Sequence, residues 1–218
     1  MKMVSMPRAS AFGYGLCLAL GALGTGCMAD GSVGEDEAIN EAPPAIVVSV
    51  PAATQAAVVP AAQTGVKVQD RSHDNENPDN TLYALYQVVN TSASAVALSS
   101  LTMRYWFTNE TPSDPLEFDC DWAQVNCSNI TARFVVLSPA SLNANTYLEI
   151  SFRAGAGSVA AGQNSGEIQT RVHHVNWSNF NTTETYSFIS DPSFVYKDTQ
   201  TVTLYQDGAL IWGVEPTT

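Results

Sequence analysis

The residue types needed for catalysis are few in this sequence, and their spacing does not suit it. Asp119 and Asp121 are a carboxylate pair of the kind that glycosidases use, but nothing marks a second acid opposite them. We interpret both as solvated or hydrogen-bonding groups. His173 and His174 are adjacent, so in a strand they point to opposite faces and cannot grip one metal ion together. GAGSVAAG at 155–162 lacks the Lys-Ser/Thr ending of a phosphate-binding loop, which favours a turn. We therefore expect that this protein is not an enzyme.

One large aromatic, Trp177, stands in a polar loop within the stretch GEIQTRVHHVNWSNFNTTETYSF at 166–188. A Trp among Asn, Ser and Thr is hard to bury without leaving polar groups unpartnered. Two interpretations are open at this point. Trp177 either anchors the loop beneath its own segment, as the usual burial of Trp favours, or it is an exposed flat platform for a ligand.

Composition excludes several kinds of partner. The 218 residues carry a formal net charge of −12, and charged residues make up only 14% of the chain. An acidic surface repels phosphate backbones and anionic lipid headgroups, so we expect no nucleic acid partner and favour a neutral ligand.

The beginning of the sequence has the pattern of an export signal over 1–27. Lys2 and Arg8 precede a short apolar run at 9–23, which is too short to span a bilayer comfortably. LGTGC at 23–27 resembles a bacterial lipoprotein signal, in which Cys27 would be lipidated. A competing cut after Ala29 fits ordinary secretion. The Ala-, Pro- and Val-rich segment 28–63 is typical of an extended tether.

The body of the chain then holds two cysteines, Cys120 and Cys127, in FDCDWAQVNCSN. In an oxidising compartment two nearby cysteines favour a disulfide that closes a short loop. Metal binding is the alternative, but a lone pair lacks the four ligands of a structural zinc site.

Alternating apolar residues predict an all-β domain over 64–218. The strand signals are at 66–69, 82–90, 98–108, 131–137 and 146–152, and Asp207-Gly208 is a hairpin signal near the end. No segment shows a helical period. Regularly spaced strands over this length favour a β-sandwich with a jelly-roll-like plan.

Five blocks of this domain resemble family 3 carbohydrate-binding modules, the cellulose-binding modules of bacterial cellulases and scaffoldins. They are FDCDWAQVNCSN, TYLEISF, GEIQTRVHHVNWSNF, YSF and VTLYQDGALIWGVEP, in this order, and the resemblance spans 65–216. It implies a nine-stranded antiparallel β-sandwich with jelly-roll topology.

The resemblance also implies a flat ligand strip made of Asp121, Trp122, Arg171 and Trp177, with Asn80 anchoring a neighbouring glucan chain. It reverses the interpretation of Trp177, which we then expect to be exposed. We further expect an Asp121–Arg171 ion pair, which would give a planar group within the strip. The family's further strip Tyr has no counterpart, because VNCSNI at 125–130 is too short to supply it.

A structural calcium ion is implied as well, at five positions with oxygen ligands that suit a hard cation. They are Thr108, Glu110, Asn181, Glu184 and Thr185. Several differ in type from the commonest family pattern. Trp106 and Trp212 lie within strands and are interpreted as core.

Two functions remain in view. The first is non-catalytic binding of crystalline cellulose or a related β-glucan by a protein that is secreted or lipid-anchored at a bacterial surface. The second is a structural or adhesion protein of the cell surface that binds another matrix glycan. Oligomer formation is not implied.

Overall fold

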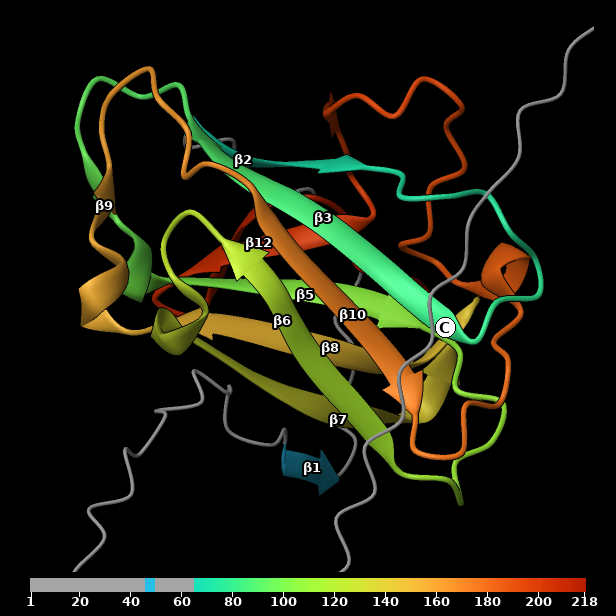
Figure 1. Ribbon diagram of the computed structural model, residues 1–218. Coiled ribbons are helices and arrows are strands. Elements are labelled where there is room, and N and C mark those ends of the chain that lie inside the picture. The colour runs from blue at the N-terminus through green and yellow to red at the C-terminus, as the bar shows by residue number, and fades with distance from the viewer. Residues whose placement is uncertain (1–45, 50–64) are drawn as a thin grey trace, which may run out of the picture. The chain divides into compact units, whose positions relative to one another are not determined.

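The computed structural model describes residues 46–49 and 65–218 (Figure 1). The chain divides into two units, Met1–Ala38 and Ile39–Thr218, and all described residues belong to the second. The predicted export signal at 1–27, its Cys27 and most of the predicted tether at 28–63 lie outside these residues. In the part that is described, no helix is both long and apolar enough to cross a membrane.

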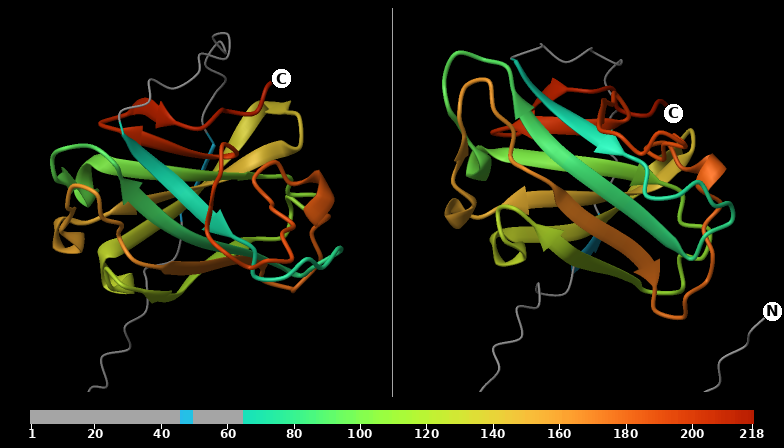
Figure 2. Two further views of the ribbon diagram at one scale, coloured as in Figure 1. Left: turned by 90° about the horizontal axis from the view of Figure 1, so that it is seen from above. Right: turned by 45° about the horizontal axis from the view of Figure 1, so that its top comes forward.

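Two sheets pack face to face, and their strands cross each other (Figures 1 and 2). The first sheet has the order β1 (Ile46–Ser49), β7 (Ile130–Ser141), β8 (Ala144–Phe152), β5 (Leu101–Phe107), β12 (Val202–Gln206), β13 (Ala209–Trp212). The second has the order β11 (Lys197–Asp198), β2 (Val66–Arg71), β3 (Thr81–Asn90), β10 (Ile168–His174), β6 (Leu116–Ala123). A small ladder joins β4 (Val96–Ala97) to β9 (Ser158–Val159).

The predicted antiparallel β-sandwich of jelly-roll type is confirmed. Without β1 and the two-residue strands β4, β9 and β11, nine strands remain in the described part of the chain, which is the implied number. The helical elements seen there are four 3₁₀ turns of three residues each: η1 (Leu98–Ser100), η2 (Cys127–Asn129), η3 (Ala154–Ala156) and η4 (Thr182–Glu184). The Gly-rich stretch 155–162 forms a turn and the short strand β9, as expected.

Alternation within the strands produces the core. In β5, Leu101, Met103, Tyr105 and Phe107 are all buried and face the second sheet. Trp212 belongs to this main core. Trp106 is buried too, but in a separate small cluster with Val135, Ala144 and Tyr147.

The predicted hairpin joins β12 to β13. Asp207 and Gly208 both adopt positive φ angles, +49° and +83°, which is the backbone form that a tight two-residue hairpin requires. Gly supplies it at no steric cost.

The strand β1 lies within the segment that we interpret as a tether. Its four residues pair in parallel with β7, with Ile46 opposite Arg133 and Ser49 opposite Val136. The remainder of 28–63 stays a prediction.

One acidic side chain is buried inside the sandwich. Asp70, the fifth residue of β2, is only 2% exposed, and its Oδ1 atom has no hydrogen-bond partner in the described structure. Burial raises its pKa well above the ordinary value of Asp, although the backbone N–H groups of Arg71 and Leu85 act in the opposite direction. The hydroxyl groups of Tyr86 and Tyr105 are also buried and unpartnered there. A raised pKa means that the folded state favours the neutral acid.

Substituting Asp70→Asn is therefore expected to change how stability depends on pH. Because the folded state holds this proton more tightly than the unfolded state, the wild type loses stability as the pH rises above about 4. The amide of the variant is neutral at every pH, so the stability of the variant relative to the wild type should increase between pH 4 and pH 8. Urea denaturation midpoints at several pH values measure this difference, with the exposed Glu76→Gln as control. An advantage that is constant over the pH range would contradict the prediction.

Candidate binding face

A β-bulge in β6 brings two neighbouring side chains to the same surface. Cys120 lies opposite Thr170 and Trp122 lies opposite Gln169, so Asp121 is an extra residue in the ladder. Adjacent residues of a regular strand point to opposite faces, and a bulge changes this direction locally. As a result Asp121 and Trp122 are both exposed, Trp122 by 47%.

The central charge of this face is Arg171 of β10. Its Nε atom lies 2.9 Å from Oδ1 of Asp121 and 3.4 Å from Oδ2 of Asp119. The expected ion pair is therefore present, and the two aspartates that we set aside as catalytic groups serve it. All three side chains are about one third exposed or more. Such a pair adds little to stability, and its main effect is to hold the guanidinium in place.

Trp177 is exposed because another ring supports it from below. Its indole stacks on the imidazole of His173 with ring centroids 4.0 Å apart and an angle of 2° between the planes. The side chain is 48% exposed, so the face turned away from His173 is open to solvent. The Trp177 backbone has a positive φ of +61° and its N–H donates to the carbonyl of His174. The exposure that the resemblance predicts for Trp177 is therefore confirmed, and the alternative of a buried loop anchor is wrong.

His173 is itself held firmly. The residue is 4% exposed, Nδ1 lies 2.9 Å from the carbonyl oxygen of His174, and Nε2 lies 3.1 Å from Oδ2 of Asp119. The sequence reasoning missed its part in this face. The available signal was its position two residues after Arg171 in a strand, which puts both side chains on one face. His174 points inward, where its ring stacks on Phe180.

The remaining residue of the predicted strip, Asn80, is exposed and precedes β3. Thr81, its neighbour, lies opposite His173 in the β3–β10 ladder and donates to Oδ1 of Asn80. Gln169, a residue that the sequence reasoning did not select, lies between Trp122 and Leu85 in the same sheet. The structure thus brings Asp121, Trp122, Arg171 and Trp177 to one side of this sheet, and Asn80 lies exposed directly before β3.

A disulfide closes the loop next to the bulge, as predicted. Cys120 and Cys127 are bonded, with Cα atoms 5.7 Å apart. The loop between them holds Asp121 and Trp122 at its start. The covalent link limits the conformations of this loop and so helps to keep both side chains in position.

The five predicted calcium positions meet at one place, between the end of β5 and η4. The Thr108 hydroxyl donates to the carbonyl of Glu184 (2.8 Å), and the Asn181 N–H donates to Oε1 of Glu110 (3.1 Å). Thr185 donates to the carbonyl of Asn181 (3.5 Å). Hydroxyl, carboxylate and carbonyl oxygens are the donors that Ca²⁺ prefers, so the residues fit the ion in type. Within the described residues, no group of three or more His, Cys, Asp or Glu side chains could hold a metal ion.

Comparison with known protein families identifies the family of this chain. A family model described as "Cellulose binding domain", that of family 3 of the carbohydrate-binding modules, matches residues 67–213. The chain belongs to this family. The family 3 match covers most of the β-sandwich, including every residue of the strip. The domain is therefore a binding module and not an enzyme.

Two curated relatives come from Paenibacillus lautus. The chain is 43% identical to an endoglucanase A over 150 residues, which is 68% of this chain and 21% of that protein. It is 40% identical to an uncharacterized protein in the celA 5′ region over 149 residues, which is 68% of this chain and 100% of that protein. The beta-mannanase/endoglucanase A of Caldicellulosiruptor saccharolyticus is 38% identical, but the match spans only 12% of its length.

Solved family 3 modules have the same fold. The module of the major scaffoldin subunit ScaA of Acetivibrio cellulolyticus matches with a TM-score of 0.66 and 34% identity, over 70% of this chain and 97% of that one. A biomass sensing module of an RsgI-like protein of Clostridium thermocellum matches with a TM-score of 0.66 and 31% identity, over 70% and 99% of the two chains.

Proposed function

We propose that this module binds the surface of cellulose, or of a closely related insoluble β-glucan, through the strip Trp122, Asp121, Arg171 and Trp177. One observation carries the proposal: two half-exposed indoles lie on the same sheet surface, with an ion pair between them. Trp122 lies beside Gln169 of β10, and Trp177 stacks on His173, which is four residues further along the same strand. At the rise of a strand this separation is about 13 Å.

The chemistry of the strip suits an uncharged, flat ligand. A glucan chain presents C–H groups on its faces and hydroxyl groups at its edges. Indole rings that lie against the C–H face bury apolar area, while the charged groups between them accept and donate hydrogen bonds. Because the ligand has no charge, the acidic balance of the chain does not oppose binding.

The size of the strip sets an approximate affinity. By analogy with the stacking of nucleobases on aromatic side chains, each aromatic platform contributes about 1–3 kcal/mol to the binding free energy. Two platforms with polar contacts between them are consistent with binding in roughly the micromolar range. The loop at 125–130 is too short to add the family's further strip Tyr, so we expect weaker binding than a three-platform strip would give.

We also propose a structural calcium ion at Thr108, Glu110, Asn181, Glu184 and Thr185. The support is that five residues from two distant parts of the sequence converge there with oxygen donors. An ion at this place would join the end of β5 to the loop that follows Trp177. It would stabilise the backbone that presents the indole.

The location that we propose is outside the cell. The relatives include cellulases and a cellulosomal scaffolding protein, and the disulfide is consistent with an oxidising compartment. Lipid attachment at Cys27 and ordinary secretion after a cut behind Ala29 are the two alternatives for export. The mass of the mature N-terminal peptide distinguishes them. A surface structural or adhesion protein for another matrix glycan is the alternative function.

Replacing Trp177 by Ala should lower the affinity for microcrystalline cellulose by about tenfold or more, because one stacking platform is lost. Trp122→Ala should have an effect of the same order. Depletion binding isotherms measure both. Leu142→Ala is the matched control, since Leu142 is a 68% exposed apolar residue in the turn between β7 and β8, on the other sheet.

Undiminished binding by Trp177→Ala would refute the proposed strip. The same isotherms on chitin, xylan and mannan test the alternative function. Preference for one of these over cellulose would favour the second candidate.

Calcium should raise the melting temperature of the module, because an ion that binds only the folded state stabilises it by mass action. We expect a lower midpoint in EDTA than in millimolar calcium. Glu110→Gln should reduce this difference, whereas Glu76→Gln should leave it unchanged. Identical melting curves of the wild type in calcium and in EDTA would show that the site does not bind the ion.

A further inference from the structure

Both ring nitrogens of His173 face hydrogen-bond acceptors. Nδ1 lies 2.9 Å from the backbone carbonyl oxygen of His174, and Nε2 lies 3.1 Å from Oδ2 of Asp119. Oε2 of Glu117 lies 3.5 Å from the same Nε2 atom. A ring nitrogen donates a hydrogen bond only when it carries a proton, and a neutral imidazole has one proton for its two nitrogens. The ring therefore satisfies both contacts only as the doubly protonated imidazolium.

The proton between His173 and Asp119 belongs to the histidine. Oδ2 of Asp119 also lies 3.4 Å from Nε of Arg171, and a guanidinium is a donor and never an acceptor. This oxygen thus faces donors on two sides and needs no proton of its own. Hydrogen bonds between an ionised donor and a carboxylate are stronger than neutral ones.

The charged groups around the ring come from two strands. β6 contributes the carboxylates of Glu117 and Asp119, and β10 contributes the guanidinium of Arg171, which reaches the ring through Asp119. β3 contributes Thr81, which lies opposite His173 in the ladder and has no charge. Burial opposes a charge on a residue that is only 4% exposed, and the two carboxylates offset this cost.

The same ring lies flat beneath the exposed indole. The centroids of His173 and Trp177 are 4.0 Å apart, and the ring planes differ by 2°. A cation within about 6 Å of an indole centroid is attracted by the negative face of the ring. In the imidazolium form His173 thus holds the indole down while the outer face of Trp177 stays open to a ligand. A neutral ring loses this attraction and turns a lone pair toward one of its acceptors, so it must shift.

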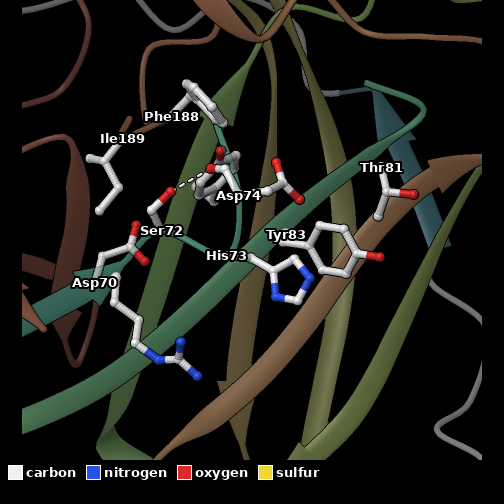
Figure 3. A pocket seen from close by; sticks show the side chains of 10 residues that line it. Asp70, Ser72, His73, Asp74, Thr81, Tyr83, Phe188 and Ile189 are labelled. Atoms are coloured by element: carbon white, nitrogen blue, oxygen red, sulfur yellow. Dashed lines mark hydrogen bonds between the residues drawn. The ribbon is translucent and has the colours of Figure 1, made fainter. Parts of the chain in front are cut away.

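The two other histidines of the chain have different surroundings. His174 is fully buried, and its ring stacks on Phe180. His73 stacks on Tyr83, with ring centroids 3.9 Å apart, at the edge of a pocket (Figure 3). In the described structure His173 is thus the histidine that stacks on an indole.

We propose that His173 is a positioning residue for the Trp177 platform, that it acts as an imidazolium, and that it makes binding to the glucan surface dependent on pH. This inference rests on the proposed function of the strip. In the protonated form the ring is hydrogen-bonded at both ends and attracts the indole, so the platform is held flat for the ligand. Loss of the proton removes both effects and loosens the platform.

The two ends of the strip then respond differently to pH. Trp122 lies beside Gln169, which does not titrate, so its platform has no corresponding support. The ligand itself is an uncharged glucan without an ionisable group. Any pH dependence of the affinity must therefore come from the protein.

Depletion isotherms of the full chain on microcrystalline cellulose test the proposal between pH 5 and pH 8, the range in which histidine ordinarily changes its charge. We expect the affinity of the wild type to be about three- to fivefold higher at pH 5 than at pH 8, as the loss of a cation–π contact implies. His173→Phe keeps a flat ring beneath the indole but cannot titrate, so its affinity should be the same at both pH values. His73→Phe and Trp122→Ala should each retain the pH dependence, although Trp122→Ala binds more weakly throughout.

Nuclear magnetic resonance measures the charge of the ring without any ligand. The ¹⁵N chemical shifts of the His173 ring follow its proton, and the indole N–H signal of Trp177 should change over the same pH interval. The midpoint of this titration should coincide with the midpoint of the affinity profile. Because this measurement uses the wild type, it decides the question even if His173→Phe does not fold, which urea denaturation at both pH values shows.

Equal wild-type affinity at pH 5 and pH 8 would overturn the role of His173, as would a His173→Phe variant with the wild-type pH dependence. A ring titration whose midpoint differs from that of the affinity profile would also overturn it. Trp177→Ala separates this failure from that of the proposed function. If this variant binds weakly while the wild type shows no pH dependence, the strip stands and the role of His173 fails. If it binds like the wild type at pH 5, the strip itself fails.

Discussion

The antiparallel pairing of β10 with β6, interrupted by one bulged residue, is the constraint on which the binding face depends. In a regular ladder Asp121 and Trp122 would point to opposite sides of the sheet, and one of them would enter the core. The extra residue removes this conflict and leaves both side chains exposed. The bulge also sets Asp121 within 2.9 Å of Arg171, and the adjoining disulfide limits how far the loop can move. A shift of this register by one residue would dismantle the strip.

Trp177 shows how an exposed indole can be held without being buried. Its loop is polar, and its backbone groups are satisfied locally, with the Ser178 N–H bonded to Asn176 and His174 bonded to the Ser178 carbonyl. The support comes from the ring of His173, which is fixed in turn by Asp119. Asp119 also lies near Arg171, so a single carboxylate connects the support of one platform to the ion pair at the centre of the face.

The two sheets have different tasks in this arrangement. The strip uses the outer surface of the sheet formed by β2, β3, β10 and β6. The other sheet contributes β5, β8 and β12 to the common core. Outward side chains can therefore change without disturbing the packing beneath them.

The sequence by itself determined the class of fold, the hairpin at Asp207-Gly208 and the disulfide, because alternation, turn chemistry and cysteine spacing are local properties of the chain. Five separate motifs also sufficed to select Asp121, Trp122, Arg171 and Trp177. Only the tertiary structure showed how Trp177 is held in its exposed position, since its support by His173 depends on how the loop folds back over β10. The bulge at Asp121 likewise could not be predicted from the sequence. Strand register is set by pairing between residues far apart in the sequence, such as His173 and Thr81, which are 92 positions apart. No local pattern encodes such a pairing.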